Sequence, residues 1–323
     1  MKFRVRLLAG AAIGAAAFGA SLVVAATPEG AMMKAIHEGT EHEALFCVDV
    51  QNNDALAVGQ PALIMTSGDA GKTWAQVEQN VTDKALLGCS VKNGIGLIVG
   101  QNGVILRRDK GQTDWTKVDN PADDRLFAVD SNASGLAVAV GAFGQILRST
   151  DGGVTWEKET IDWQQFNADG LDIHLYAVHV ADDGVVTVAG EFATILRSTD
   201  GGVTWTAVHT GEASLFDLYL GADGFGLAVG QKGAILRTSD SGVTWTEEKS
   251  PSDANLLGVK VSGDGAVLIT GIRIMLEGRR DSAEWKEILP GDVATTWYEG
   301  VAAANDADWL VVGHRGRIVE VEP

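Results

Sequence analysis

Short apolar stretches of four to six residues alternate with polar, glycine-rich turns along almost the whole chain. One eleven-residue segment, Ile146 to Trp156, recurs without change from Ile195 to Trp205. Weaker copies of this segment end at Trp74, Trp115, Trp245 and Trp285. A repeat of about 40 residues that contains several short strands is typical of one blade of a β-propeller.

Each copy predicts four strands. The first is an apolar strand of the form Leu-aromatic-x-Val, the second ends in Ala-Val-Gly or a variant, the third carries Ile-Leu-Arg, and the tryptophan begins the fourth. Strands that are apolar on both faces are expected where each sheet is covered by a sheet on either side. First strands are predicted near residues 45, 87, 126, 175, 215, 256 and 297. Residues 27–323 are therefore predicted to form an all-β, seven-bladed propeller of four-stranded antiparallel blades.

The last copy stops after its third strand, at Ile318 to Val321, and an unpaired strand edge is unfavourable. Residues Met33 to His37 precede the first blade and have the pattern of a fourth strand, so we expect them to complete the last blade and close the ring. In four copies the turn from the second to the third strand has glycine at both ends, as at Gly141 and Gly144. We expect these glycines to supply positive φ angles.

The 40 glycines and 6 prolines agree with many tight turns, and the formal net charge of −18 makes nucleic acid a poor partner.

Residues 1–26 resemble a signal peptide, because Lys2, Arg4 and Arg6 precede an apolar stretch that ends in small residues before Thr27. An uncleaved anchor is the alternative, and no later segment is apolar enough to span a membrane. We expect an exported protein.

In four copies, the turn before the blade tryptophan carries an aspartate. The segment Ser-Thr-Asp-Gly-Gly-Val-Thr-Trp is the Asp box of bacterial-neuraminidase-type repeats. The aspartate is expected to accept hydrogen bonds within the turn and the tryptophan to pack between sheets. One carboxylate in each box is too few for calcium. We assign a structural role to Asp69, Asp151, Asp200, Asp240, Trp74, Trp156, Trp205 and Trp245.

Asp boxes also occur in sialidases, which need an arginine cluster, a tyrosine nucleophile and a general acid. The chain has three tyrosines and six scattered histidines, and it lacks the sequence motifs of serine hydrolases, phosphate-binding loops and metal sites. We therefore expect no catalytic residues, no metal and no cofactor.

Seven repeats with this sequence pattern, preceded by an export signal, resemble the photosystem II stability/assembly factor family over roughly residues 35–321. The resemblance implies a non-enzymatic propeller in the periplasm, or in the thylakoid lumen of a phototroph, that binds a reaction-centre subunit during assembly. It implies a membrane-protein or exported client, peripheral membrane contact at most, and a monomer. Two alternatives stay open: a sialidase-like or glycan-binding propeller, and a periplasmic accessory of an envelope transporter.

Members of that family expose arginines for partner contact, and here an arginine lies eight residues before the tryptophan at Arg107, Arg148, Arg197 and Arg237. The other three blades carry Thr66, Glu277 and Glu320 in this column. Guanidinium groups suit carboxylate-bearing partners. The alternative is that each arginine pairs within or between blades and only stabilises the ring.

The fourth copy contains about eight extra residues, and this insertion carries Trp163 and Phe166. Exposed aromatic residues in a loop are candidate anchors for a partner. Alternatively, Trp163 folds back over a blade edge.

Cys47 and Cys89 occupy what the repeat alignment gives as the same position in neighbouring first strands. Equivalent side chains point the same way, so a disulfide is not expected on geometric grounds, although an oxidising compartment would favour one.

Overall fold

A computed structural model describes residues 31–122, 124–166, 170–304 and 308–322. The predicted signal peptide, residues 1–26, lies outside the described residues. Within these ranges, no helix is long and apolar enough to cross a membrane.

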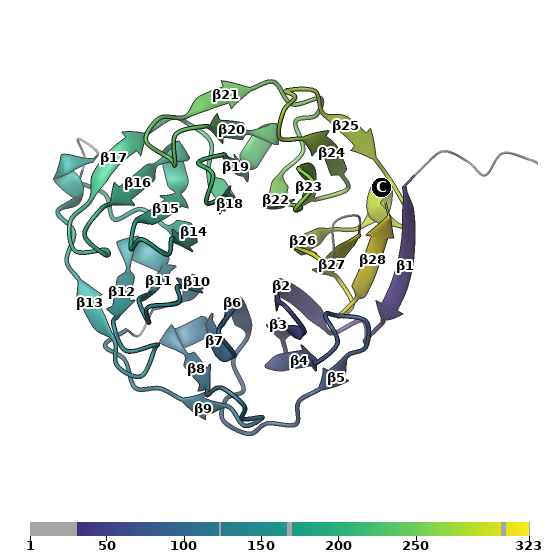
Figure 1. The fold of residues 1–323 in the computed structure, drawn as a ribbon, viewed down its shortest axis with the longest axis horizontal. Coiled ribbons are helices and arrows are strands. Elements are labelled where there is room, and N and C mark those ends of the chain that lie inside the picture. Colours follow the sequence, from purple (N-terminus) through teal and green to yellow (C-terminus); the bar gives the residue numbers. More distant parts are fainter. Residues whose placement is uncertain (1–30, 123, 167–169, 305–307, 323) are drawn as a thin grey trace, which may run out of the picture.

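Seven four-stranded antiparallel sheets surround a central axis (Figure 1), which confirms the predicted propeller. Within each blade the strands follow one another from the inner to the outer side of the ring. Blades 1 to 3 are β2 (Ala44–Gln51), β3 (Asp54–Gln60), β4 (Leu63–Ser67), β5 (Ala75–Gln76); β6 (Leu86–Lys92), β7 (Ile95–Gly100), β8 (Ile105–Arg108), β9 (Thr116–Lys117); and β10 (Leu126–Ser131), β11 (Ala137–Gly141), β12 (Ile146–Ser149), β13 (Glu157–Glu159).

The next blades follow the same order. Blades 4 to 6 are β14 (Leu175–Val180), β15 (Val186–Gly190), β16 (Ile195–Ser198), β17 (Thr206–His209); β18 (Leu215–Leu220), β19 (Gly226–Gly230), β20 (Ile235–Thr238), β21 (Thr246–Glu248); and β22 (Leu256–Val261), β23 (Ala266–Gly271), β24 (Met275–Arg279), β25 (Lys286–Ile288). Blade 7 is β26 (Tyr298–Ala303), β27 (Trp309–Gly313), β28 (Ile318–Glu322) and β1 (Met32–His37).

Short 3-10 turns join some strands. Four of them link a second strand to a third, and two lie in connections between blades: η1 (Gln101–Gly103), η2 (Ala142–Gly144), η4 (Glu191–Ala193), η5 (Gln231–Gly233), and η3 (Trp163–Gln165), η6 (Val293–Thr295).

The N-terminal strand closes the ring as expected. β1 pairs antiparallel with β28, with Met33 opposite Val321 and Lys34 opposite Glu320, and Figure 1 shows β1 lying along the outer side of β28. The first and last parts of the chain therefore form one sheet, and β28 is not left as an exposed edge.

The core lies between the blades. All residues of β11 are buried, and the apolar cluster around Val138, Trp163 and Val188 is shared by blades 3 and 4. Each second strand is therefore covered on both faces, which explains the continuous apolar runs in the sequence.

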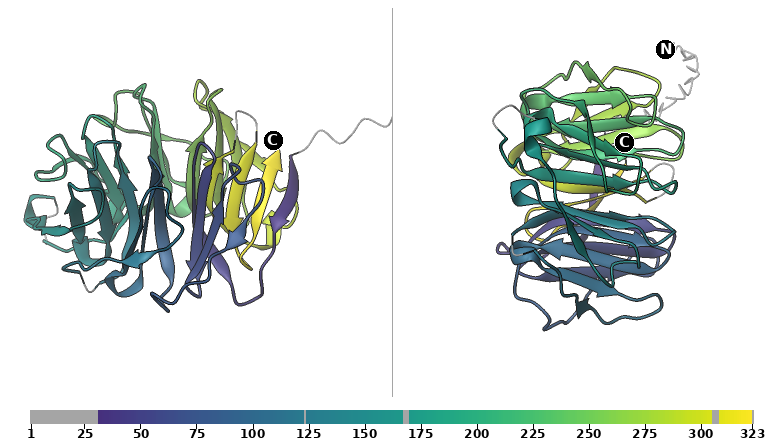
Figure 2. Two further views of the ribbon diagram at one scale, coloured as in Figure 1. Left: turned by 60° about the horizontal axis from the view of Figure 1, so that its bottom comes forward. Right: turned by 90° about the vertical axis from the view of Figure 1, so that its left-hand side faces the viewer.

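Turns gather on two faces of the disc, which is seen edge-on in Figure 2. Leu126 begins β10 opposite Gly141, so the turns from second to third strands lie where the first strands begin; we call this the turn face. The Asp boxes follow the other ends of the third strands, since Ser149 pairs with Ala137; we call this the Asp-box face.

The two glycines of each second-to-third turn have different functions. Gly144 has a φ of +66°, as expected. Gly141 is extended, with a φ of −163°, and is required for another reason: a Cβ there would lie 2.2 Å from the Arg125 carbonyl oxygen. The expectation of positive φ was wrong for the first glycine, which allows a close backbone approach.

The Asp boxes have nearly the same geometry in every copy. In blade 4, Asp200 accepts hydrogen bonds from the Thr204 amide at 2.9 Å and its hydroxyl at 2.6 Å, and the Trp205 indole donates to the Gly202 carbonyl at 3.1 Å. The boxes of Asp69, Asp151 and Asp240 repeat these contacts. The polar groups of each Asp-box turn therefore find their hydrogen-bond partners within the same turn.

These hydrogen bonds make acid stability a testable property. The threonine hydroxyl and amide donors lower the pKa values of Asp69 and Asp240 from 3.8 to about 2, so their stabilising effect is present above pH 3.8 and lost as the pH falls towards 2. We expect the T73V/T244V variant to melt below the unaltered protein at pH 7, and the difference to shrink between pH 4 and 2. Thermal unfolding followed by circular dichroism measures this, with T206V on β17 as control. A pH-independent difference would contradict the explanation.

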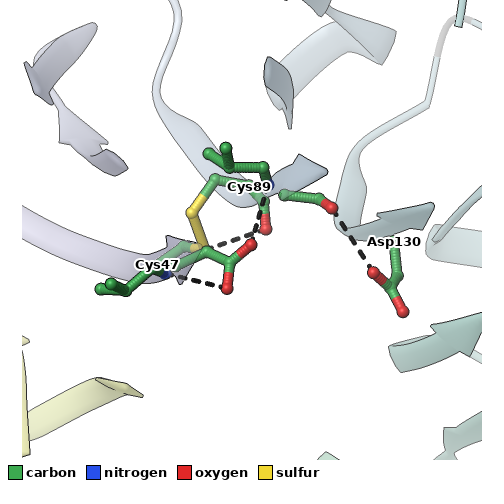
Figure 3. Close-up of a disulfide and its surroundings, with 7 residues drawn as sticks. Cys47, Cys89 and Asp130 are labelled. Carbon is green, nitrogen blue, oxygen red and sulfur yellow. Dashed lines mark hydrogen bonds between the residues drawn. A yellow bond between two sulfur atoms is a disulfide. The ribbon is translucent and has the colours of Figure 1, made fainter. Parts of the chain in front are cut away.

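Cys47 and Cys89 form a disulfide with a Cα–Cα distance of 5.9 Å (Figure 3), so the expectation of unpaired cysteines was wrong. The error lies in the register. Leu86, and not Leu87, is the equivalent of Leu45, because they pair with Gly100 and Gly59. Cys89 therefore lies one strand position further along than Cys47. The same bulge follows Leu45 in β2 and Leu86 in β6, so the offset of one position comes from the sequence, and with it the two side chains meet across the gap between blades.

Candidate functional site

The first strands line a central cavity of about 310 Å³. Its wall includes aromatic residues that follow the first leucine of these strands, such as Phe46, Phe127 and Phe216, and charged residues further along them, such as Asp130 and Lys260. The cavity therefore combines an apolar band with a ring of ionisable groups.

Three aspartates in the cavity wall clasp neighbouring blades. Asp49, Asp130 and Asp217 each accept a 2.8 Å hydrogen bond from a backbone amide of the next blade's first strand, donated by Val91, Val180 and Val259 respectively. These clasps join blades 1 to 2, 3 to 4 and 5 to 6. These contacts were not predicted from the sequence, because an aspartate in an apolar strand shows no repeat signature.

Burial in the wall disfavours charge on two neighbouring carboxyl groups. Desolvation raises the pKa of Asp217 to about 6, although the Val259 and Leu218 amides oppose this. Desolvation and then the charge of Asp217 raise the pKa of Glu299 to about 8. Glu299 is therefore mostly protonated at neutral pH.

Because of its raised pKa, Glu299 lowers the free energy of unfolding as the pH rises. Below pH 4.5 the folded and unfolded states both hold the proton; above it, only the folded state keeps it until about pH 8, so stability falls across that window. We expect Glu299→Gln to raise the melting temperature by about 2 °C or more at pH 8 and to change it little at pH 4.5. Calorimetry at both pH values tests this, with Glu157→Gln on β13 as control. The same shift at both pH values would refute it.

Aromatic rings form chains around the mouth of the cavity. Phe127 lies 5.2 Å from Tyr176, which lies 5.5 Å from Phe216, and Phe46 stacks on Trp297 at 5.9 Å between ring centroids. The aromatic residue that follows the first leucine of the inner strand therefore faces the mouth of the cavity in blades 1, 3, 4 and 5.

The arginine column points into the joints between blades. The Arg148 Nε donates to the Gly201 carbonyl at 2.7 Å, and the Arg107 and Arg197 Nε atoms donate to Gly152 and Ser241 in the same way. Each acceptor belongs to the Asp-box turn of the next blade. Arg237 follows this pattern through its terminal nitrogens and also pairs with Glu248. This placement favours the alternative in which the arginines stabilise the ring; contact with a partner stays a prediction.

Because these arginines hold neighbouring blades together, we expect their removal to lower the free energy of unfolding. Replacing Arg148 by Ala leaves the Gly201 carbonyl without its charged donor, and we expect a loss of about 1.5–3 kcal/mol in the free energy of unfolding. Lys158→Ala is the control, because that cationic side chain is exposed on β13 of the same blade, so the change should stay below about 1 kcal/mol. Urea denaturation measures both; equal losses would contradict the assignment.

The insertion packs inward. Trp163 is 6% exposed, lies against Gly144 and meets Phe166 edge to face at 5.9 Å. Asp162 caps η3 by accepting from the Gln164 amide. Trp163 therefore folds back over the blade edge, as in the alternative, while residues 167–169 of the insertion lie outside the described residues.

Tyrosine geometry bears on the sialidase alternative. Tyr298 is fully buried and its hydroxyl donates to Asp292 at 2.8 Å; burial and this carboxylate raise the pKa of the phenol. Such a phenol is a poor nucleophile. Tyr176, in the wall of the central cavity, contacts Glu191, and burial followed by this carboxylate raises the pKa of its phenol as well. In the described part of the chain, no group of three or more His, Cys, Asp or Glu residues could hold a metal ion.

The family model described as "Photosynthesis system II assembly factor YCF48" matches residues 108–213, from the end of β8 through blade 4. This match confirms the resemblance to the photosystem II assembly factors, and it covers the two copies that carry the unchanged segment. No curated protein sequence matches the chain.

Solved propellers resemble the whole ring. "YCF48 bound to D1 peptide" is 16% identical with a TM-score of 0.70, covering 91% of this chain and 95% of that one. YCF48 from Cyanidioschyzon merolae is 17% identical with a TM-score of 0.69, covering 90% and 99%. Virginiamycin B lyase from Staphylococcus aureus is 14% identical with a TM-score of 0.76, covering 91% and 99%. At these identities the likeness concerns the fold, which an assembly factor and a lyase share.

Proposed function

We propose that this chain is an exported, non-catalytic scaffold that holds a segment of a membrane-complex subunit while the complex assembles. The observation that carries the proposal is the assembly-factor match over residues 108–213. The fold likeness to a YCF48 solved with a D1 peptide supports a protein segment as the ligand. In a phototrophic host the client is a photosystem reaction-centre subunit.

Two features of the molecule support export and a binding function. The disulfide between Cys47 and Cys89 suits an oxidising compartment such as the periplasm or thylakoid lumen. Aspartate contacts join three pairs of neighbouring blades, arginine contacts join blades 2 to 6, and β1 closes the ring, which together favour a rigid frame. A rigid frame loses little entropy when a partner binds.

Crosslinking in the native cells, followed by purification and mass spectrometry of the captured proteins, tests the proposal. We expect an integral membrane subunit of a photosynthetic or other envelope complex. Binding of the purified protein to a glycan array, with no membrane protein captured, would overturn it in favour of the glycan-binding alternative.

A further inference from the structure

The tips of the second-to-third turns differ sharply from blade to blade. The residue two positions after the glycine that ends the second strand is on the turn face in every blade. In blade order these tip residues are Pro61, Asn102, Phe143, Phe192, Lys232, Arg273 and Arg315. In blades 2 to 7 the tip residue has the same left-handed backbone, so the differences between these tips are differences of surface chemistry; in blade 1 the positive φ lies at Ala62 instead.

Two of the tips are phenylalanines in a backbone conformation that disfavours them. Phe143 and Phe192 have φ values of 54° and 57°, in the left-handed region, where Asn102 has the same conformation in blade 2. Bulky side chains are uncommon there, and asparagine or glycine is preferred. Both phenylalanines are also exposed, by 62% and 50%. Folding gains little from either ring, and strained residues of this kind cluster at binding sites.

A continuous series of rings joins one tip to the central cavity. Phe143 meets His174 edge to face at 5.0 Å, and the His174 Nδ1 accepts the Phe143 amide at 2.9 Å. His174 lies 6.2 Å from both Phe127 and Tyr176, which line the cavity. We call Phe143, His174, Phe127, Tyr176 and Phe216 the aromatic track. It offers successive apolar contacts from the rim inward.

Cations lie on the same face, although the chain is strongly acidic. Lys232 and Arg273 are exposed tips of blades 5 and 6, and Arg125 lies at the start of blade 3 with its guanidinium 6.0 Å from the Phe127 ring. None of these three takes part in an ion pair among the residues that the structure describes, whereas the Arg315 tip pairs with Glu41 at 3.1 Å. The turn face therefore has cations available for a partner's carboxylates. A nearby carboxylate, Glu191, is held by the His174 amide.

We propose that the turn face over blades 3 to 6 is the docking surface for an extended peptide segment of a partner protein, with aromatic or aliphatic side chains adjoining carboxylates. This inference rests on the proposed scaffold function and names its surface. The apolar side chains pack on Phe143, Phe192 and the aromatic track, while Arg125, Lys232 and Arg273 bind the carboxylates. A flat membrane surface is disfavoured as the occupant, because it could touch the exposed tips but could not reach Phe127 and Tyr176 in the wall of the cavity.

Site-specific photocrosslinking separates this inference from the proposed function. The full chain carries benzoylphenylalanine in place of Phe143 or Phe192, or in place of Val154 or Val203 as matched controls. The two valines lie in Asp-box turns of the same blades, on the other face, and are 52% and 51% exposed.

The result expected in native cells is capture at positions 143 and 192, with the crosslinked peptide carrying both apolar residues and carboxylates. Capture only at positions 154 and 203 would overturn the docking surface and leave the scaffold function intact. Failure to capture a protein at all four positions would count against both.

Binding of defined probes gives a second test. Two fluorescent pools of twelve-residue peptides are compared by anisotropy: one has Leu or Phe in the first half and two glutamates in the second, and the other has lysines in place of the glutamates. We expect the glutamate pool to bind at least tenfold more tightly, with affinity falling as salt rises. Equal binding of the two pools, or no binding of either, would overturn the proposal.

Two variants show which residues recognise the peptide. F143N/F192N should weaken binding of the glutamate pool at least tenfold and leave the melting temperature unchanged or raised, because asparagine tolerates the left-handed backbone. K232E/R273E should weaken it as much and reduce or reverse its salt dependence, because two attractive charges become repulsive ones while Arg125 remains. Unchanged affinity in either variant would overturn the assignment of that part of the surface.

Discussion

A chain that begins at Thr40, and so lacks β1, is expected to lose about 5 kcal/mol or more in its free energy of unfolding. Five residues of β1 pair with β28, and each net backbone hydrogen bond contributes about 1 kcal/mol. Removing β1 also exposes the edge of β28, where Val319 and Val321 are fully buried. Such an edge invites aggregation as well as unfolding.

Urea denaturation of the shortened chain measures the loss, and a chain that begins at Ala31 and keeps β1 is the control. A synthetic peptide of residues 31–39, added in excess, should restore part of the stability by occupying the edge of β28. Equal stability of the two chains would mean that β1 covers the blade without holding the ring closed.

The second large effect concerns the disulfide. The Cys47 and Cys89 residues are 42 positions apart, and for a loop of that length the chain-entropy model gives a contribution of about 4 kcal/mol. We expect the C47S/C89S variant to unfold at correspondingly lower urea concentration, and reduced wild-type protein to behave like the variant. The measurement is urea denaturation with and without a reductant.

The variant S90A controls for substitution near the bridge, because Ser90 lies beside Cys89 and makes only long hydroxyl contacts at 3.4 Å. A C47S/C89S protein as stable as the unaltered one would contradict the prediction. Alkylation of the unreduced protein followed by mass spectrometry should find no free thiol in the folded state.

The repeat pattern was sufficient for the architecture. The unchanged copies ending at Trp156 and Trp205 set the period, and the missing last strand after Ile318 pointed to Met33 as its replacement. This succeeded because each blade is built from local hairpins, whose strand pattern and turn residues are readable along the chain.

The candidate site was predicted less well, for a geometric reason. Arg148 and Trp163 looked like partner contacts because arginines and inserted aromatic residues are often exposed, yet both lie between blades. Phe143 and Phe192 were not predicted, because the turn motif that contains them is recognised by its glycines. The available signal was a phenylalanine at a turn position that carries a polar or charged residue in four other blades, Asn102, Lys232, Arg273 and Arg315.

The sequence by itself determined the number of blades, their strand order and the closing strand, since these depend on hydrophobic period and turn chemistry within single hairpins. The tertiary structure decided which side chains face a neighbour and which face solvent. Cys89 lies one strand position further along than Cys47, and the placement of blade 2 against blade 1 brings the two sulfur atoms together. Contacts between blades depend on the rotation of one sheet relative to the next, and no local pattern in the chain encodes that rotation.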